Sequence, residues 1–333
     1  MMMKYKTIEI FKGGSLSRTE LLESLDKKRV VRKSVSKKEN REYGLVRWQS
    51  QYKRLQRYNH IFPHIFPKLI GVGHDETSYF FDLEYLEGFV NLKDYLVESV
   101  VTDIDAVEIA EKVFSLAQEM HTFEKIRSNI GVFELYLQEE CFSKFKDAAQ
   151  NSRFYKFAQQ KKILFNNEEL NNLEFNQKWL QMFVLKLKVS SECYTHGNLT
   201  LENILFNPEL KIFKFIDPYE ENIIDCAEAD FSQIKQCSVG HYGLIMESSY
   251  SIRSNEINVE YDIPKCFTAF NQRINHLISH NLKDYNSKVE DFLYISQFYR
   301  MLPFKVQSGN IDQAIVFYGL ACKLLQNLRD KYE

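Results

Sequence analysis

A loop and a short strand just past the middle of the chain carry residues that could handle a phosphate. The loop reads THGNLTLENILF (195–206), and the strand after it reads KIFKFIDP (211–218). A loop followed by a hairpin would bring the side chains of Asn203 and Asp217 together. Phosphoryl transfer from a nucleotide needs oxygen ligands for Mg²⁺ and a group that orients the acceptor hydroxyl. The residue types therefore predict that Asn203 and Asp217 hold Mg²⁺ beside a triphosphate.

This stretch resembles the catalytic core of the protein-kinase-like phosphotransferases that act on small molecules, the aminoglycoside phosphotransferase and choline kinase group. The loop of that group reads H-G-D-x-x-x-x-N, and the strand after it ends I-D. Here the loop begins His196-Gly197-Asn198 and continues to Asn203, and the strand ends at Asp217. The resemblance implies transfer of a phosphoryl group from ATP to a hydroxyl. It places Asn198 beside the acceptor and gives His196 the task of supporting the loop.

A second segment extends the resemblance. ADFSQIKQCSVGHYGLI (229–245) is similar to the helix that follows the core in kinase-like proteins linked to capsule and surface-polysaccharide synthesis. In those proteins an acid at the position of Asp230 supports the catalytic loop through hydrogen bonds. The resemblance is specific over residues 190–245 and looser over the rest of the chain. It implies that the acceptor is a sugar or a sugar-linked alcohol of surface-polysaccharide metabolism.

One loop residue departs from the pattern, because Asn198 stands where the group has an Asp. That Asp accepts or orients the proton of the attacking hydroxyl, whereas a carboxamide cannot take up a proton at neutral pH. General-base catalysis contributes roughly 10²–10⁴-fold, but phosphoryl transfer proceeds mainly by positioning and electrostatics. We therefore expect a slowed reaction. Asn198 could also be an introduced change that traps a substrate complex, or the natural residue of a protein that binds nucleotide without turnover.

The N-terminal part offers groups that could hold the phosphates. Lys33, in the run KRVVRKSV, is similar to the strand lysine of the group that pairs with the α- and β-phosphates. Backbone N–H groups of a turn at Gly13, Gly14 and Ser15 could approach an anion closely. The structural alternatives are a surface lysine and an ordinary hairpin turn.

The helix expected after the strand of Lys33 lacks a well-placed acid. In the group, a helix Glu forms an ion pair with the strand lysine. Glu39 and Glu42 come early in the expected helix, and the alignment further along gives Gln49 or Gln51. If the partner is a glutamine, Lys33 loses its ion pair and is held less firmly.

Charges are distributed unevenly, although the net charge is −2. Residues 27–57 carry twelve Lys and Arg against two acids, and residues 217–230 carry six acids and no base. A cationic and an anionic region in one chain suit a bound polyanion with its metal ions; two solvated faces are the alternative. The basic helix at 37–57 could also contact an anionic glycan or membrane. No overall positive field indicates a nucleic-acid partner.

The composition is that of a reduced globular protein. The 333 residues are 44% hydrophobic and 26% charged, which allows a large core. Six widely spaced cysteines without a CxxC pair are expected to be reduced and mostly buried. The N-terminus has no apolar signal core, and no run approaches the roughly 18 apolar residues of a membrane helix. We therefore expect a cytoplasmic protein without a transmembrane segment.

The elements that must position these residues differ between the two ends of the chain. Up to about residue 85 the sequence predicts strands: a hairpin around the Gly-Gly-Ser turn, a third strand at KRVVRKSV and another at SYFFDLEYLEG. Between them, apolar residues recur at helical spacing through Trp48 and Tyr52, with Ser36 as a candidate cap.

Beyond Gly88 the pattern turns helical, and the chain after Asp225 is expected to be mostly helical. Residues 130–165 match no pattern well enough to be assigned. Glu84 and Leu86 fall in the connector between the two parts, where the group binds adenine through backbone groups.

The predicted fold is α+β, bilobal and protein-kinase-like. A small lobe is expected at 1–87 and a helical lobe at 88–333, with a ligand cleft between them. The preferred function is ATP-dependent, Mg²⁺-assisted phosphorylation of a hydroxyl on a small molecule. The alternative is a catalytically silent pseudokinase that serves as a nucleotide-binding or scaffolding module. A third possibility is polyanion binding through the basic helix.

Overall fold

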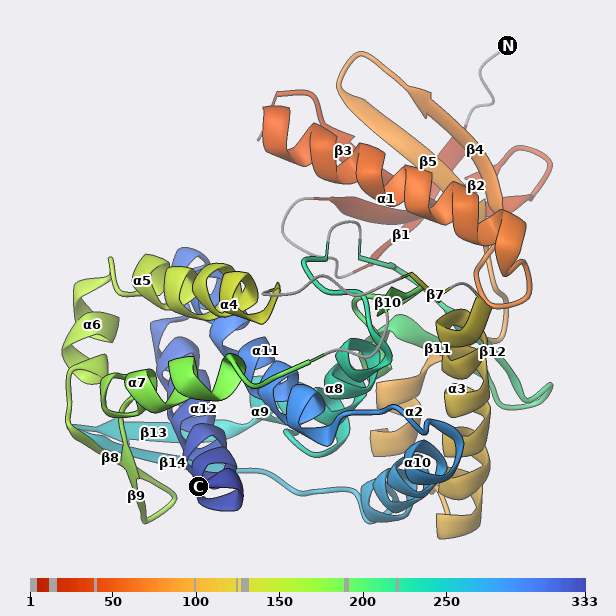
Figure 1. Ribbon diagram of the computed structural model, residues 1–333. Coiled ribbons are helices and arrows are strands. Elements are labelled where there is room, and N and C mark those ends of the chain that lie inside the picture. The colour runs from red at the N-terminus through yellow and green to blue at the C-terminus, as the bar shows by residue number, and fades with distance from the viewer. Residues whose placement is uncertain are drawn as a thin grey trace. The chain divides into compact units, whose positions relative to one another are not determined.

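The computed structural model describes the chain over residues 5–11, 17–38, 41–98, 100–123, 125–126, 132–188, 192–219 and 222–333. The chain forms two compact units (Figure 1). The sheet unit comprises residues 1–95 and 196–222, and the helical unit comprises residues 96–195 and 223–333. The candidate loop and strand therefore belong to the same unit as the N-terminal strands. The functional lobe boundary expected after residue 87 stays a prediction.

The sheet unit is built on an antiparallel sheet of five strands in the order β1-β2-β3-β5-β4 (Figure 1). The strands are β1 (Tyr5–Phe11), β2 (Arg18–Ser24), β3 (Arg29–Ser36), β4 (Leu69–His74) and β5 (Ser78–Glu84). The three strands expected from the glycine turn and the β-branched run are confirmed as β1, β2 and β3. β3 pairs with β2 on one side and with β5 on the other, so its side chains have neighbours on both edges.

A long helix, α1 (Arg41–Ile61), covers one face of this sheet through aromatic contacts. Trp48 stacks on Tyr52 with a centroid separation of 5.9 Å and lies 6.1 Å from Phe81 of β5. Phe81 is directly opposite Lys33 in the β3–β5 register. Because paired residues share a face of the sheet, the side chain of Lys33 lies on the face that α1 covers.

A second, smaller sheet of the same unit carries the candidate loop. Its strands β6 (Val90–Asn91), β11 (Ile204–Asn207) and β12 (Ile212–Phe215) lie in the order β12-β11-β6. The hairpin pairs Ile204 with Phe215, and the carbonyl of Asn203 accepts the N–H of Ile216 at 2.9 Å. The hairpin thus places residue 203 opposite residue 216, directly before Asp217.

The helical unit packs around α11 and α12, whose buried faces are almost continuous. α2 (Leu92–Glu98) passes from the sheet unit into it. Its other helices are α3 (Asp103–Phe123), α4 (Val132–Tyr136), α5 (Lys144–Ala148), α6 (Ser152–Ala158), α7 (Leu173–Val184), α8 (Ala227–Ser238), α9 (Tyr242–Glu247), α10 (Cys266–Asn281), α11 (Ser287–Gln307) and α12 (Ile311–Tyr332). A π-helical segment, Leu137–Ser143, joins α4 to α5, and β7 (Lys125–Ile126) pairs with β10 (Glu192–Cys193).

The sequence misses one hairpin and places one helix cap wrongly. The stretch after Asp225 is mostly helical, as expected, but β13 (Ser249–Arg253) and β14 (Glu256–Glu260) form a hairpin within it. They join β8 (Lys162–Phe165) and β9 (Glu168–Asn171) in a sheet of order β13-β14-β8-β9. Ser36 ends β3 and does not cap α1; its hydroxyl accepts the N–H of Lys38 at 3.2 Å.

The predicted fold class is confirmed as mixed α+β, with an N-terminal sheet region and a helical C-terminal part. All six cysteines are free and buried, as the sequence predicts. No helix in the described part of the chain is both long and apolar enough to cross a membrane.

Candidate nucleotide and metal site

The candidate loop folds around the ring of His196, which is fully buried. Its Nε2 donates to the carbonyl of Ile216 at 2.8 Å, and its Nδ1 accepts the N–H of Asn198 at 3.3 Å. The ring also lies parallel to that of Phe66, with centroids 6.0 Å apart. A single imidazole therefore connects the loop to the strand that leads to Asp217.

Gly197 is required by the backbone at this point. Its φ is +74°, and a Cβ would lie 2.2 Å from Nδ2 of Asn222. Any larger residue would be destabilised both by the left-handed conformation and by displacement of the Asn222 side chain. The glycine of the H-G-N motif is thus explained by local geometry.

The backbone of Asn198 orients the carboxamide of Asn203. The Asn198 carbonyl accepts the N–H of Thr200 at 2.9 Å and Nδ2 of Asn203 at 2.8 Å. Because the amide nitrogen of Asn203 is used in this way, its Oδ1 is left as an acceptor. The side chain of Asn198 is half-buried and has no hydrogen-bond partner among the described residues. That carboxamide is thus available to an acceptor molecule.

Asp217 adopts the left-handed conformation, with φ +56°. This region is uncommon for residues with a side chain, although Asp and Asn enter it more often than most. The backbone is fixed on both sides of Asp217: Ile216 donates to Asn203, and the N–H of Tyr219 donates to the carbonyl of His196 at 2.9 Å. Such over-determined, strained residues concentrate at functional sites.

Lys33 pairs directly with Asp217, across 184 positions of sequence. Its Nζ lies 2.6 Å from Oδ1 of Asp217, and the side chains are 11% and 41% exposed respectively. The missing helix Glu is therefore replaced by the carboxylate predicted to bind metal. Oδ2 of Asp217 has no hydrogen-bond partner in the described parts of the chain.

Helix α1 contacts the backbone beside Asp217. Gln51 is 8% exposed, and its Nε2 lies 3.4 Å from the carbonyl of Pro218. Arg54 donates to the carbonyl of Tyr219, and the guanidinium of Arg47 lies 5.5 Å from the Tyr219 ring centroid. Of the two glutamines that the resemblance suggests, Gln51 faces the site. The side chains of residues 39 and 42 lie outside the described residues.

Sequence reasoning missed the two arginines, although a signal was present. Positions 47, 51 and 54 follow the i, i+4, i+7 spacing of one helix face. Interpreted as a set, Arg47, Gln51 and Arg54 form a polar stripe on the basic helix. Part of the basic region therefore contacts the segment at 217–219, where the acidic stretch begins.

The residues present fit a magnesium ion that is bound together with a nucleotide. Mg²⁺ takes oxygen ligands and usually combines one or two carboxylates with phosphate oxygens and water. Oδ1 of Asn203 and Oδ2 of Asp217 are oxygens left over by the hydrogen bonds described above. The described residues contain no cluster of three or more His, Cys, Asp or Glu side chains that could hold a metal ion alone. An ion here would rely on phosphate oxygens for the rest of its shell.

The predicted adenine connector offers one open donor. The N–H of Leu86 has no hydrogen-bond partner among the described residues, whereas its carbonyl accepts the N–H of Phe89 at 3.4 Å. Glu84 is engaged in the sheet: its N–H donates to Lys68 at 2.9 Å, and its Oε1 accepts the N–H of Lys68 at 2.8 Å. Gly13, Gly14 and Ser15 lie outside the described residues.

Asp230 lies on α8 and is fully buried. Its Oδ2 is 2.9 Å from Nε2 of His121, at the end of α3. The pair joins two helices of the helical unit, a contact that the spacing of the two residues along the chain does not reveal. The hydrogen bonds from Asp230 to the catalytic loop stay a prediction.

No protein-family model matches this chain, and no curated protein matches its sequence. Among solved structures, one similar chain is the crystal structure of a "putative fructosamine-3-kinase" from Thermobifida fusca. The TM-score is 0.52 at 10% sequence identity, over 95% of this chain and 94% of that chain. The chain has a kinase-like fold. At this identity the likeness shows the fold alone.

Proposed function

We propose that the chain is a phosphotransferase that uses ATP to phosphorylate a hydroxyl on a small molecule, a sugar or a sugar-linked alcohol. The observation that carries the proposal is the contact between Lys33 and Asp217 at 2.6 Å, beside a loop that leaves Oδ1 of Asn203 open. The Thermobifida fusca protein supports a sugar-derived acceptor through its name. An acceptor from surface-polysaccharide metabolism rests on the sequence resemblance. A cytoplasmic location rests on the widely spaced cysteines and on the N-terminus without an apolar signal core.

Each residue has a role that follows from its place. Asn203 and Asp217 would hold Mg²⁺, which neutralises charge on the transferring phosphate. Lys33 would share its ammonium group between Asp217 and the α- and β-phosphates. The N–H of Leu86, in the connector that begins at Glu84, would donate to adenine. The sequence resemblance, and not a described position, gives the Gly13–Ser15 turn the role of covering the phosphates.

Asn198 would orient the acceptor hydroxyl through its carboxamide. An amide can accept the hydroxyl hydrogen bond but cannot remove the proton. The proton would therefore leave with the transferred phosphate or with water, and the reaction would depend on positioning by the loop. His196 and Gly197 supply that positioning, because they fix the backbone on which Asn198 sits.

The metal-nucleotide site is tested by thermal unfolding with Mg-ATP, with ATP alone and with Mg²⁺ alone. We expect a shift only when both are present, corresponding to about 2.7 kcal/mol at a hundredfold excess over Kd. Asp217→Asn should remove the shift. Glu209→Gln is the matched control, because Glu209 is an exposed acid just before β12. Absence of any shift in the unsubstituted chain would remove the proposal.

The second candidate is a nucleotide-binding pseudokinase, and the observation that favours it is Asn198. Asn198→Asp restores the carboxylate of the resembled family. ATP consumption over a panel of sugars and alcohols separates the candidates. Turnover by the unsubstituted chain, raised roughly 10²–10⁴-fold by the change, supports the enzyme. If the unsubstituted chain binds Mg-ATP but only the Asn198→Asp variant consumes ATP, the result supports the pseudokinase.

A further inference from the structure

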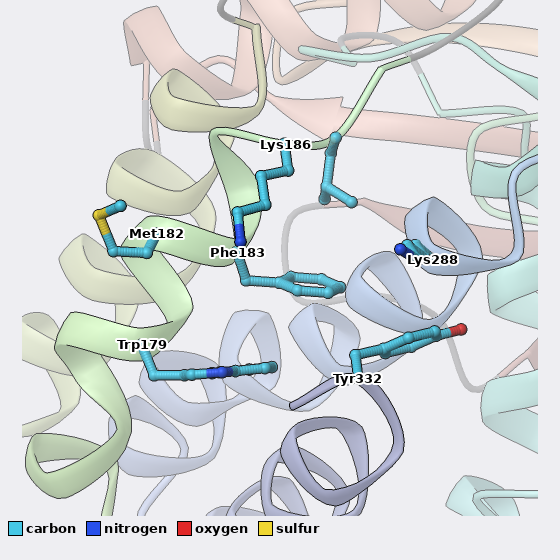
Figure 2. A pocket seen from close by; sticks show the side chains of 7 residues that line it. Trp179, Met182, Phe183, Lys186, Lys288 and Tyr332 are labelled. Atoms are coloured by element: carbon cyan, nitrogen blue, oxygen red, sulfur yellow. The ribbon is translucent and has the colours of Figure 1, made fainter.

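A small pocket lies in the helical unit, between α7, the start of α11 and the end of α12 (Figure 2). Its cavity volume is about 140 Å³. It is lined by Trp179, Met182, Phe183, Lys186, Leu187, Lys288 and Tyr332. None of these residues belongs to the loop, strand or helix of the site described above.

Three of the seven residues that line the pocket are aromatic. Trp179 and Phe183, one helical turn apart on α7, have centroids 5.0 Å apart and an interplanar angle of 18°. The ring of Tyr332 lies 5.6 Å from that of Phe183. Figure 2 shows the side chains of Trp179 and Phe183 from α7 together with the ring of Tyr332 from the end of α12. Such rings bury large flat areas and favour a flat apolar partner.

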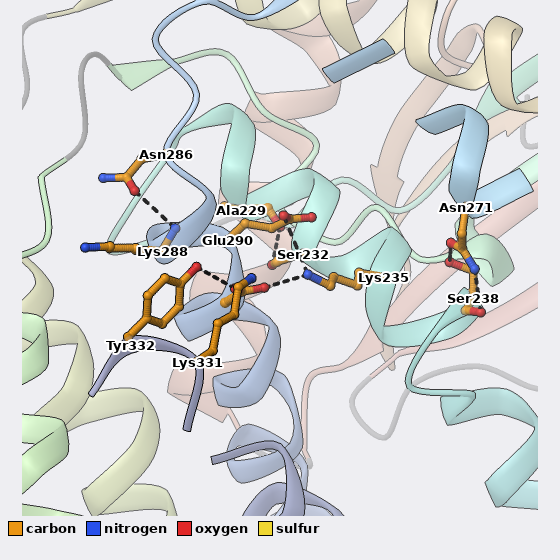
Figure 3. A network of polar contacts seen from close by, with 11 residues as sticks. Ala229, Ser232, Lys235, Ser238, Asn271, Asn286, Lys288, Glu290, Lys331 and Tyr332 are labelled. Atoms are coloured by element: carbon orange, nitrogen blue, oxygen red, sulfur yellow. Dashed lines mark hydrogen bonds and ion pairs between the residues drawn. The ribbon is translucent and has the colours of Figure 1, made fainter. Parts of the chain in front are cut away.

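A partly buried polar network holds Tyr332 in place (Figure 3). The Tyr332 hydroxyl donates to Oδ2 of Asp291 at 3.0 Å, and Asp291 also accepts from Lys235 at 2.6 Å and Lys331 at 2.7 Å. Burial raises the pKa of Asp291, but the charge and hydrogen bond of Lys235 together with Lys331 lower it below its ordinary value. Asp291 is thus an ionised acceptor that fixes the ring, so the wall is formed before any ligand arrives.

Two lysines at the pocket carry uncompensated positive charge. Lys186 and Lys288 form no ion pair with any acid in the described parts of the chain; Lys288 Nζ lies 5.3 Å from the Tyr332 ring centroid. The carboxylates close by are already engaged: Asp291 as above, and Glu333 with Arg329 at 2.6 Å. The pocket therefore combines an aromatic wall with a net positive rim.

We propose that this pocket binds a small aromatic anion. The ring would lie against the three aromatic side chains, and the carboxylate or phosphate would lie beside the ammonium groups of Lys186 and Lys288. The size agrees, because a cavity of about 150 Å³ is known to accommodate benzene. A cationic ligand would be repelled by the lysines, and a neutral one would not use them. This proposal does not depend on phosphotransferase activity.

The chain has two tryptophans, Trp48 and Trp179, so Trp48→Phe leaves Trp179, which lines the pocket, as the single tryptophan. In this background we would titrate benzoate, phenyl phosphate and the uncharged isostere benzamide. We expect a saturable change in Trp179 emission with the anions and about threefold to tenfold weaker binding of benzamide. Stronger binding of one anion identifies whether carboxylate or phosphate is preferred.

The lysines are tested with the double variant Lys186→Ala/Lys288→Ala, which should weaken benzoate binding by about threefold to tenfold. Lys178→Ala is the matched control, since Lys178 is exposed on α7 and does not line the pocket. If Trp48→Phe does not fold, saturation-transfer NMR of benzoate on the otherwise unsubstituted chain and lysine variants gives the same comparison. No saturable binding, equal affinity for benzamide, or unchanged affinity in the double variant would overturn the proposal.

Discussion

At the scale of single residues, Lys33 and Asp217 form an ion pair whose two members differ in exposure. The lysine side chain is 11% exposed and the aspartate side chain is 41% exposed. A charge left without its partner is strongly destabilising when it is buried and well tolerated when water can reach it. The same pair should therefore respond differently depending on which member is removed.

We expect Asp217→Asn to lower the free energy of unfolding by about 1–3 kcal/mol, because it leaves the buried ammonium group of Lys33 without a countercharge. Lys33→Met should cost less than about 1 kcal/mol, because the exposed carboxylate can hydrate and the methionine fills the space. Urea unfolding of both variants and of the double variant measures the coupling. Equal losses of unfolding free energy in Asp217→Asn and Lys33→Met would show that the different burial of the two side chains does not decide the effect.

At the scale of elements, α1 acts on the site through the backbone. Gln51 and Arg54 reach the carbonyls of Pro218 and Tyr219, next to the left-handed Asp217. In the resembled family the corresponding helix holds the strand lysine through an acid. In this chain α1 contacts the segment that follows Asp217, and Asp217 forms the ion pair with Lys33.

We expect Arg54→Gln to weaken Mg-ATP binding about threefold to tenfold while changing the free energy of unfolding by less than about 1 kcal/mol, because the hydrogen bond to the Tyr219 carbonyl beside Asp217 is lost. Arg57→Gln, an exposed arginine of the same helix, is the control. Isothermal titration with Mg-ATP and urea unfolding give the two quantities. A loss of stability without a change in affinity would make Arg54 a packing residue only.

The elements that sequence reasoning predicted well are those with a strong local pattern. β-branched alternation and turn glycines located β1, β2 and β3, and helical spacing located α1. The hairpin of β13 and β14 was missed although Tyr250, Ile252, Ile257 and Val259 alternate around a turn at Ser254. The helical patterns on both sides of this short hairpin favour helix when the segment is interpreted as a whole.

The candidate site contains contacts that local sequence patterns cannot predict. Spacing alone suggested Asn203 and Asp217, since a hairpin joins them. It could not reveal the contact of Lys33 with Asp217, which depends on pairing of segments 184 positions apart. Nor could it give the orientation of the Asn203 amide, which is set by the carbonyl of Asn198.

At the scale of the whole molecule, the chain divides into two compact units, and one hydrophobic cluster lies within the helical unit. The helical unit contains a buried lysine with no acid nearby among its described contacts. Lys305 of α11 is 8% exposed. Its Nζ lies 2.8 Å from Sδ of Met246, and 5.9 Å and 5.7 Å from the ring centroids of Tyr242 and Phe317. Burial lowers the pKa of Lys305 to about 8.

This lysine predicts a pH dependence. Between pH 8 and about 10.5 the unfolded chain keeps the Lys305 proton and the folded chain does not, so the free energy of unfolding should rise with pH in that window. Below pH 8 the folded chain bears the full cost of the buried charge. Lys305→Met should raise stability at pH 7 by roughly 1–3 kcal/mol and flatten the rise.

Urea unfolding from pH 7 to 10.5, followed through Trp179 in the helical unit, checks this difference between the unsubstituted chain and Lys305→Met. Lys323→Met on α12 is the control, because Lys323 Nζ is paired with Glu168 at 2.6 Å and is partly exposed. An unchanged pH profile in Lys305→Met would assign the dependence to other groups.

The sheet unit is assembled from two stretches of chain, residues 1–95 and 196–222. On the ribosome, the first stretch emerges long before its partner. At about 5–20 residues per second, the interval between residues 95 and 222 lasts roughly 6–25 s. Throughout that time β6 lacks β11, and Lys33 lacks its carboxylate. The nascent N-terminal sheet is therefore incomplete and exposed to chaperones and proteases during this interval, and a chain truncated before residue 217 would lack the carboxylate that pairs with Lys33.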